Sequence, residues 1–190
     1  MKPAWAAFAV IALFAVSSSA ALITDYTDMG NLSATVDART NSLTVAAGDV
    51  VVMVAAVNKK ASVEPVTFTS AAGTFIDLDA NTQLGNDPNP NAYLSYLTIG
   101  TGGTYDFIGS GNALTANLGI YKLTADSGVI ELADNNAKRY GNLAPGDSLS
   151  VTNFMGWGGN PNYGEYDDIA VIGVAYSLRG NISTASLTLD

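Results

Sequence analysis

The chain has 190 residues, 48 % of them hydrophobic and 13 % charged, with no Cys and no His. This length suits one domain, and so apolar a composition excludes an intrinsically disordered chain. A net charge of −9 at pH 7 argues against nucleic acid and anionic membranes as partners. Without His or Cys there is no imidazole-based catalytic triad, thiol nucleophile, thiolate metal site or disulfide, so any metal must bind to oxygen, which favours Ca²⁺.

Residues 1–21 have the pattern of an export signal. Lys2 gives a positive start, residues 5–16 are apolar, and residues 17–21 are small, with Ser19 and Ala21 suited to cleavage before Leu22. The alternative is a membrane anchor, but the apolar run is shorter than the ~20 residues that span a bilayer. We therefore predict a signal peptide over 1–21 and a single secreted domain over 22–190, with no membrane span in the mature chain.

The remaining chain is patterned as strands. Short β-rich runs recur about every ten residues between clusters of Gly, Asn, Asp and Pro, which is typical of an all-β sandwich or barrel. We expect strands at 32–36, 42–46, 49–57, 66–70, 74–78, 92–99, 104–108, 114–124, 129–132, 148–154, 168–178 and 185–189. So many strands favour a two-sheet antiparallel β-sandwich of the jelly-roll kind over an immunoglobulin-like sandwich.

Two of these runs, 50–57 and 169–176, are apolar at almost every position. A strand with one face in water alternates polar and apolar residues. Both runs are therefore predicted to be central strands with one face in the core and the other face also covered or facing a partner. The pair Gly102-Gly103 suggests a hairpin between the strands at 92–99 and 104–108.

A first candidate site follows the strand at 74–78. Asp77, Asp79 and Asn81 alternate as the oxygen ligands of calcium loops do, and Asp87 follows. The sixth position is Thr82 rather than Gly, so the alternative is a solvated turn. Glu165, Asp167 and Asp168 form a second possible oxygen cage. Bound Ca²⁺ is accordingly a possible, but not a required, cofactor.

A second candidate site lies at 156–168. Trp157, the one Trp of the mature chain, stands among glycines together with Asn162, Tyr163, Glu165, Tyr166 and Asp167. Aromatic rings stack on sugar faces while amides and carboxylates bind hydroxyls, so this loop is a candidate glycan site. The alternative is a Trp that folds back to cap the sandwich.

Three functional hypotheses remain. The first is a secreted, non-enzymatic structural subunit of a cell surface or extracellular matrix that self-associates through edge strands at 32–36 and 42–46. The second is a carbohydrate-binding or adhesive module that uses the Trp157 loop. The third is a small glycoside hydrolase, although no pair of carboxylates is marked out. Export without cysteine is commoner in bacteria than in animals, so we expect a bacterial source.

Overall fold

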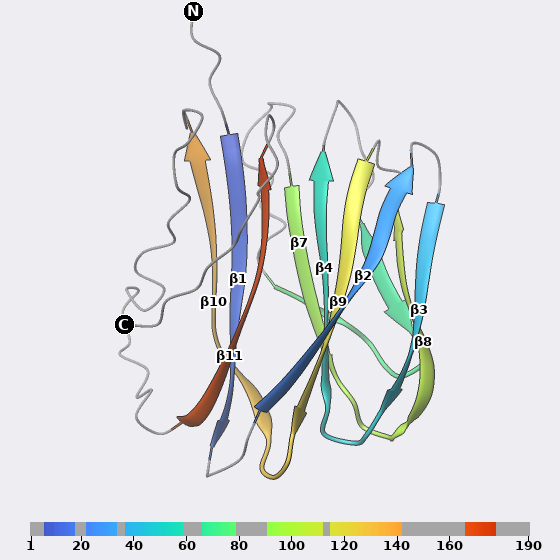
Figure 1. Ribbon diagram of the computed structural model, residues 1–190, viewed down its shortest axis with the longest axis vertical. Coiled ribbons are helices and arrows are strands. Elements are labelled where there is room, and N and C mark those ends of the chain that lie inside the picture. The colour runs from blue at the N-terminus through green and yellow to red at the C-terminus, as the bar shows by residue number, and fades with distance from the viewer. Residues whose placement is uncertain are drawn as a thin grey trace, which may run out of the picture.

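A computed structural model of the chain describes residues 6–17, 22–33, 37–58, 66–78, 91–111, 115–141 and 166–177 (Figure 1). All the described elements are strands, and the sheets that they form are antiparallel. The predicted all-β sandwich is therefore confirmed.

The strands are β1 Ala6–Ser17, β2 Leu22–Ser33, β3 Asp37–Val45, β4 Val50–Asn58, β5 Thr67–Ser70, β6 Ile76–Asp77, β7 Asn91–Thr98, β8 Gly103–Gly111, β9 Thr115–Ala125, β10 Ile130–Gly141 and β11 Tyr166–Ser177. Within this part of the chain no helix is long and apolar enough to cross a membrane.

The strands pair into three sheets. Their orders are β10-β1-β11, β2-β9-β4-β7-β6 and β3-β8-β5. The five-stranded sheet lies between the other two, because its two faces contribute to different core clusters. One face packs against Phe14 of β1 and Ile172 of β11, and the other packs against Phe107 of β8.

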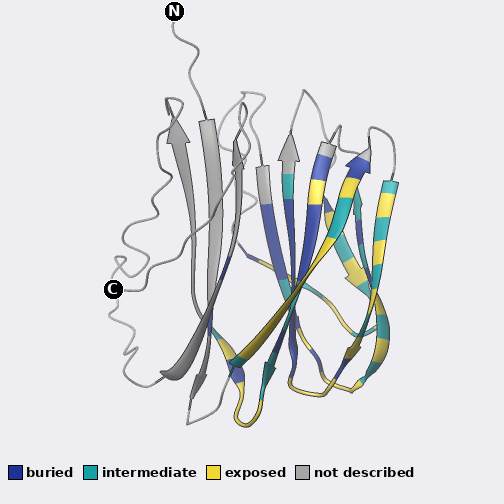
Figure 2. Cartoon of the chain, in the orientation of Figure 1, coloured by how far each residue is buried: buried dark blue, intermediate teal, exposed yellow. Residues whose placement is uncertain are grey.

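Strand β4 explains why a run can be apolar at every position. Val50, Val52 and Val54 belong to the cluster with Phe14, whereas Val51 and Met53 belong to the cluster with Phe107. Successive residues of a strand point to opposite faces, so both faces of β4 are buried. Figure 2 shows the described part of β4 and of its neighbour β7 as the most deeply buried strands. The prediction of a central strand covered on both faces is correct here.

The second apolar run, 169–176 in β11, is not in a central strand of the described sheet. Strand β11 pairs with β1 alone among the described strands, so it lies at the edge of its sheet and not at its centre. The predicted hairpin at Gly102-Gly103 is also wrong. Strand β7 pairs with β4 and β6, whereas β8 pairs with β3 and β5, so the chain changes sheets between these two strands. Apolar content predicted burial, but it did not specify the pairing partner.

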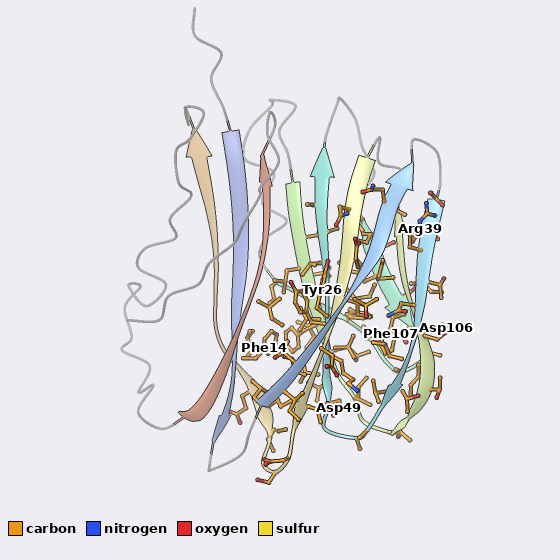
Figure 3. All side chains as sticks on the ribbon, in the orientation of Figure 1. Phe14, Tyr26, Arg39, Asp49, Asp106 and Phe107 are labelled. Atoms are coloured by element: carbon orange, nitrogen blue, oxygen red, sulfur yellow. The ribbon has the colours of Figure 1, made fainter. Side chains whose placement is uncertain are left out.

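The apolar part of the predicted leader is a strand in this structure. Strand β1 lies at the centre of the β10-β1-β11 sheet and pairs along its length with both neighbours. Phe14 is fully buried against the five-stranded sheet (Figure 3). Removal of residues 1–21 stays a prediction, and it would take the middle strand out of this sheet.

Candidate functional site: the open edge at β2

The predicted glycan loop lies mostly outside the described residues. Trp157, Asn162, Tyr163 and Glu165 belong to a segment that the structure does not describe. Tyr166 begins β11 and pairs with Ser17, and Asp167 follows it in the same strand. Only the backbone placement of these two residues is described, so the glycan site stays a prediction.

Of the four predicted ligands in the first calcium loop, only Asp77 lies in the described part of the chain. Asp77 lies in the short strand β6, and its carboxylate accepts a hydrogen bond from the Ser95 hydroxyl at 2.5 Å. Asp79, Asn81 and Asp87 fall outside the described residues. Within the described part of the chain, no group of three acidic side chains gathers to hold a metal.

Among the described residues, the outer edge of β2 is a different candidate for a functional site. This strand pairs with β9 on one side, and no other described strand pairs with it. Residues 23–28 are all exposed, although successive residues of a strand point to opposite faces. Ile23 is 55 % exposed and Tyr26 is 52 % exposed, and Figure 2 shows this half of β2 as a continuous exposed stretch.

The second half of β2 is anchored in the core. Leu32 is fully buried, and Met29 packs against two core clusters. The change occurs at an irregularity in the pairing with β9, where Met29 is the additional residue between Asp28 and Gly30. Gly30 has a positive φ of 83°, which glycine adopts without strain, and its N–H donates to the Asp28 carboxylate at 2.8 Å. The exposed residues 23–28 thus lie between a buried second half of β2 and Leu22, which packs against the core cluster of Phe14.

Residues 23–28, the open half of β2, pair with β9 along the backbone and also contact it through side chains. The rings of Tyr26 and Tyr121 lie 4.7 Å apart at 43°, and these two residues are direct cross-strand partners. Asp25 lies 3.8 Å from the Lys122 ammonium. The Tyr26 ring also covers Gly119, where an added Cβ would meet ring atom Cε2 at 2.7 Å.

These contacts shift the titration of both phenols. Burial is the main cause that raises the pKa of Tyr26, and the carboxylate of Asp28 and the phenol of Tyr121 raise it further. Burial also raises the pKa of Tyr121. The Tyr26 side chain is therefore partly covered, and it is neutral at neutral pH.

The outer face of the β3-β8-β5 sheet has the opposite character. Thr44 and Thr104 share a hydrogen bond at 2.9 Å, Thr67 and Ser110 share one at 3.0 Å, and the Ser42 hydroxyl donates to Asp106. Neighbouring strands are thus linked by hydroxyl and carboxylate groups that already bind one another. A polar face of this kind is stable in contact with water. The edge of β2 differs from this face because it exposes apolar side chains.

Comparison with known proteins assigns no family. No protein-family model matches this chain, no curated protein matches it, and no solved structure matches it. Any proposal about function therefore depends on the geometry of the described residues.

Sequence reasoning placed an edge strand at 32–36 but missed the open half of β2, because residues 22–28 mix apolar and acidic residues without a period of two. The signal that was available is the pair of large apolar residues, Ile23 and Tyr26, in an otherwise polar run.

Proposed function

We propose that this protein is a secreted, non-enzymatic β-sandwich that serves as a structural subunit of a cell surface or extracellular matrix. In this proposal residues 1–21 direct export and are removed, and the mature chain begins at Leu22, the first residue of β2. Copies of the chain then associate through the open edge of β2.

The observation that carries the proposal is the open half of β2. An unpaired strand edge presents N–H and C=O groups that a strand of another molecule can bind, which is β-augmentation. Soluble proteins usually protect such an edge with charge or cover it. Here Asp25 and Asp28 are the only charges on the open half, and Ile23 and Tyr26 add apolar surface that association would bury.

The opposite edge of the five-stranded sheet is a weaker candidate. Strand β6 has two residues in the described part of the chain, and the Asp77 side chain is bonded to Ser95. A short edge strand offers few hydrogen-bonding groups to a partner. The edge of β2 is therefore the one that we assign to association with a second copy.

Light scattering coupled to size-exclusion chromatography tests this proposal on the exported chain. The expected result is a molar mass that exceeds that of one chain and rises with protein concentration. A mass equal to one chain at every concentration would exclude a self-associating subunit.

Deletion of residues 22–41 is a poor test of the same idea. It would remove buried Leu32 and the first half of β3 together with the open edge. Ile23 and Tyr26 belong to none of the described core clusters, so their substitution tests the edge without removing a core residue.

A further inference from the structure

We infer that two copies of the chain pair their β2 strands antiparallel across a two-fold axis, with Tyr26 of one copy opposite Tyr26 of the other. The inference rests on the proposed association through the open half of β2, and it specifies how the second copy binds there. The residues that carry it lie in the described part of the chain, and none of them belongs to the predicted leader.

The open half of β2 is a regular strand up to Asp28. Residues 22–28 pair with β9 without interruption, and the irregularity in the register follows them. In such a strand the N–H and C=O groups of successive residues point alternately to the two sides. Strand β9 occupies one side, and no other described strand pairs with residues 23–28 on the other side. A strand of a second copy can therefore continue the five-stranded sheet.

Symmetry limits how two identical β2 strands can pair. An antiparallel pair of identical strands has a two-fold axis perpendicular to the sheet, and directly opposed residues point to the same face. Side chains alternate between the two faces, so each residue must oppose one that lies an even number of positions from it. One residue of β2 is therefore opposite its own copy on the axis, and the choice of that residue defines the register.

Charge excludes the other registers near the middle of the open half. With Asp25 on the axis, two carboxylates would directly oppose each other, which destabilises a strand pair. With Thr24 on the axis, Asp25 would face Ile23 of the second copy. With Thr27 on the axis, Asp25 would face Met29. Both of these registers place the charge against an apolar side chain, where it gains no hydrogen bond. An in-register parallel pair would place each carboxylate beside its own copy.

With Tyr26 on the axis, each carboxylate of the open half faces a hydroxyl group. Asp25 opposes Thr27 of the second copy, and Asp28 opposes Thr24 of the second copy. A threonine hydroxyl donates a hydrogen bond that a carboxylate accepts, so these pairs compensate the charges that the interface covers. The two-fold axis repeats each pair, and both acidic residues thus have a donor opposite them.

The same kind of pair joins strands within the chain. Ser42 and Asp106 are directly opposed in β3 and β8, and the Ser42 hydroxyl donates to the Asp106 carboxylate. Ser95 and Asp77 are directly opposed in β7 and β6, and the Ser95 hydroxyl donates to the Asp77 carboxylate at 2.5 Å. A hydroxyl opposite an Asp is therefore a recurrent cross-strand contact in this fold, and the register with Tyr26 on the axis repeats it between copies.

This register also covers the exposed aromatic side chain. Tyr26, which is labelled in Figure 3, is 52 % exposed, and within one chain it opposes Tyr121 with ring centroids 4.7 Å apart. Pairing brings the two Tyr26 side chains together on one face, so that Tyr121 and Tyr26 of both copies form a continuous row. Cross-strand aromatic pairs stabilise a sheet. Ile23 lies just beyond each end of the paired stretch, beside Met29 of the second copy, so it is covered as well.

Cysteine cross-linking tests the register, because the natural chain has no cysteine. Tyr26→Cys should give a disulfide between two chains, since directly opposed residues are within reach of a disulfide. Asp25→Cys is the matched control, because its two copies are diagonal neighbours about 7–8 Å apart, which is too far for the bond. A mixture of the Asp25→Cys chain and the Thr27→Cys chain should again cross-link. Mass spectrometry of unreduced peptides identifies each bond.

The expected result is a disulfide for Tyr26→Cys and for the mixture, and none for Asp25→Cys alone. A bond between two Asp25→Cys chains, with none between two Tyr26→Cys chains, would put Asp25 on the axis. Bonds between like chains at both positions would indicate parallel pairing. Either result overturns the register while self-association through β2 stands. A chain that keeps the mass of one chain would contradict the proposed function as well, so the two failures are distinguishable.

An exchange of opposed residues is a second test, and it needs no cysteine. Thr27→Asp places a carboxylate opposite Asp25 on both sides of the axis, and these like-charge pairs should raise the dissociation constant of the two copies about tenfold. Asp25→Thr combined with Thr27→Asp again gives each carboxylate a threonine opposite it, so the double variant should return to the parental constant. Light scattering over a dilution series measures the constant for each chain. Equal weakening in the single and the double variant would overturn the register.

Discussion

Phe14, which is labelled in Figure 3, packs edge-on against Tyr96, with ring centroids 5.6 Å apart and ring planes at 70°. Phe14 comes from β1 in the three-stranded sheet, and Tyr96 comes from β7 in the five-stranded sheet. The contact therefore joins two sheets through a residue of the predicted leader. In the proposed exported chain, which begins at Leu22, this contact is absent.

Phe14→Ala is expected to destabilise the chain that keeps its leader. The ring is fully buried, and truncation of a buried Phe to Ala costs about 3–5 kcal/mol. Ala21→Tyr places a large residue at the predicted cleavage site and should keep the leader attached. Denaturant unfolding in this background measures the loss, and Phe14→Leu, which keeps most of the volume, should cost less. Equal stability of Phe14→Ala and its parent would show that β1 does not contribute to the core.

Gly109→Ala is expected to strain the core beside β8. An added Cβ would lie 2.8 Å from Leu118 Cδ1 and 3.5 Å from Phe68 Cδ1. Leu118 is fully buried, so relief requires a core side chain to move, at a cost of about 1–3 kcal/mol. Gly100→Ala is the matched control, because its Cβ would meet nothing within 4 Å. If both variants melt at the parental temperature, the packing described for Gly109 is incorrect.

Asp49→Ala is expected to loosen the turn that leads into β4. The Asp49 side chain is buried, and its Oδ2 accepts the Ala46 N–H at 2.8 Å. The Asp49 carbonyl also accepts the Ile99 N–H at 2.8 Å, which fixes the turn against the end of β7. Removal of the acceptor should cost about 1–3 kcal/mol of unfolding free energy, and Asp49→Asn, which keeps an oxygen, should cost less. A larger loss for Asn than for Ala would contradict this role.

The sequence was sufficient to predict the class of fold and several strands. The run at 50–57 was expected to be central and covered on both faces, and β4 has that place because its odd and even residues enter different clusters. The expected strands at 42–46 and 92–99 also correspond to β3 and β7 within a few residues, except that β3 begins earlier, at Asp37. Alternation and turn residues are local signals, so they locate strands well.

Pairing could not be predicted in the same way. The Gly102-Gly103 turn was expected to join neighbours in one sheet, but β7 and β8 pair in different sheets. The run 169–176 within β11 is apolar throughout, as most of β4 is, yet β11 lies at an edge of the described sheet. Partner choice depends on contacts between residues far apart in the chain, which no local pattern records. Predictions for Trp157 and Asp87 fall outside the described residues and stay predictions.

Alkaline pH is expected to destabilise the fold through Tyr26 and Tyr121. Both phenols have a raised pKa in the folded chain, so the folded state holds their protons at a pH where the unfolded state has released them. The unfolded state then binds fewer protons, and the free energy of unfolding falls as pH rises through and above about 10. Denaturant unfolding between pH 8 and 11 measures this fall, and Tyr26→Phe with Tyr121→Phe should make it shallower. An unchanged slope in the double variant would assign the effect to other groups.

The central claim is self-association through the open half of β2, and the most direct measurement is the molar mass of matched variants of the exported chain by light scattering. Ile23→Lys and Tyr26→Lys place charge on the edge, whereas Val129→Lys changes a residue that is 62 % exposed in the turn before β10. We predict that the two edge variants have the mass of one chain at concentrations where the parent and Val129→Lys are larger. Edge variants that associate as the parent does would contradict the claim.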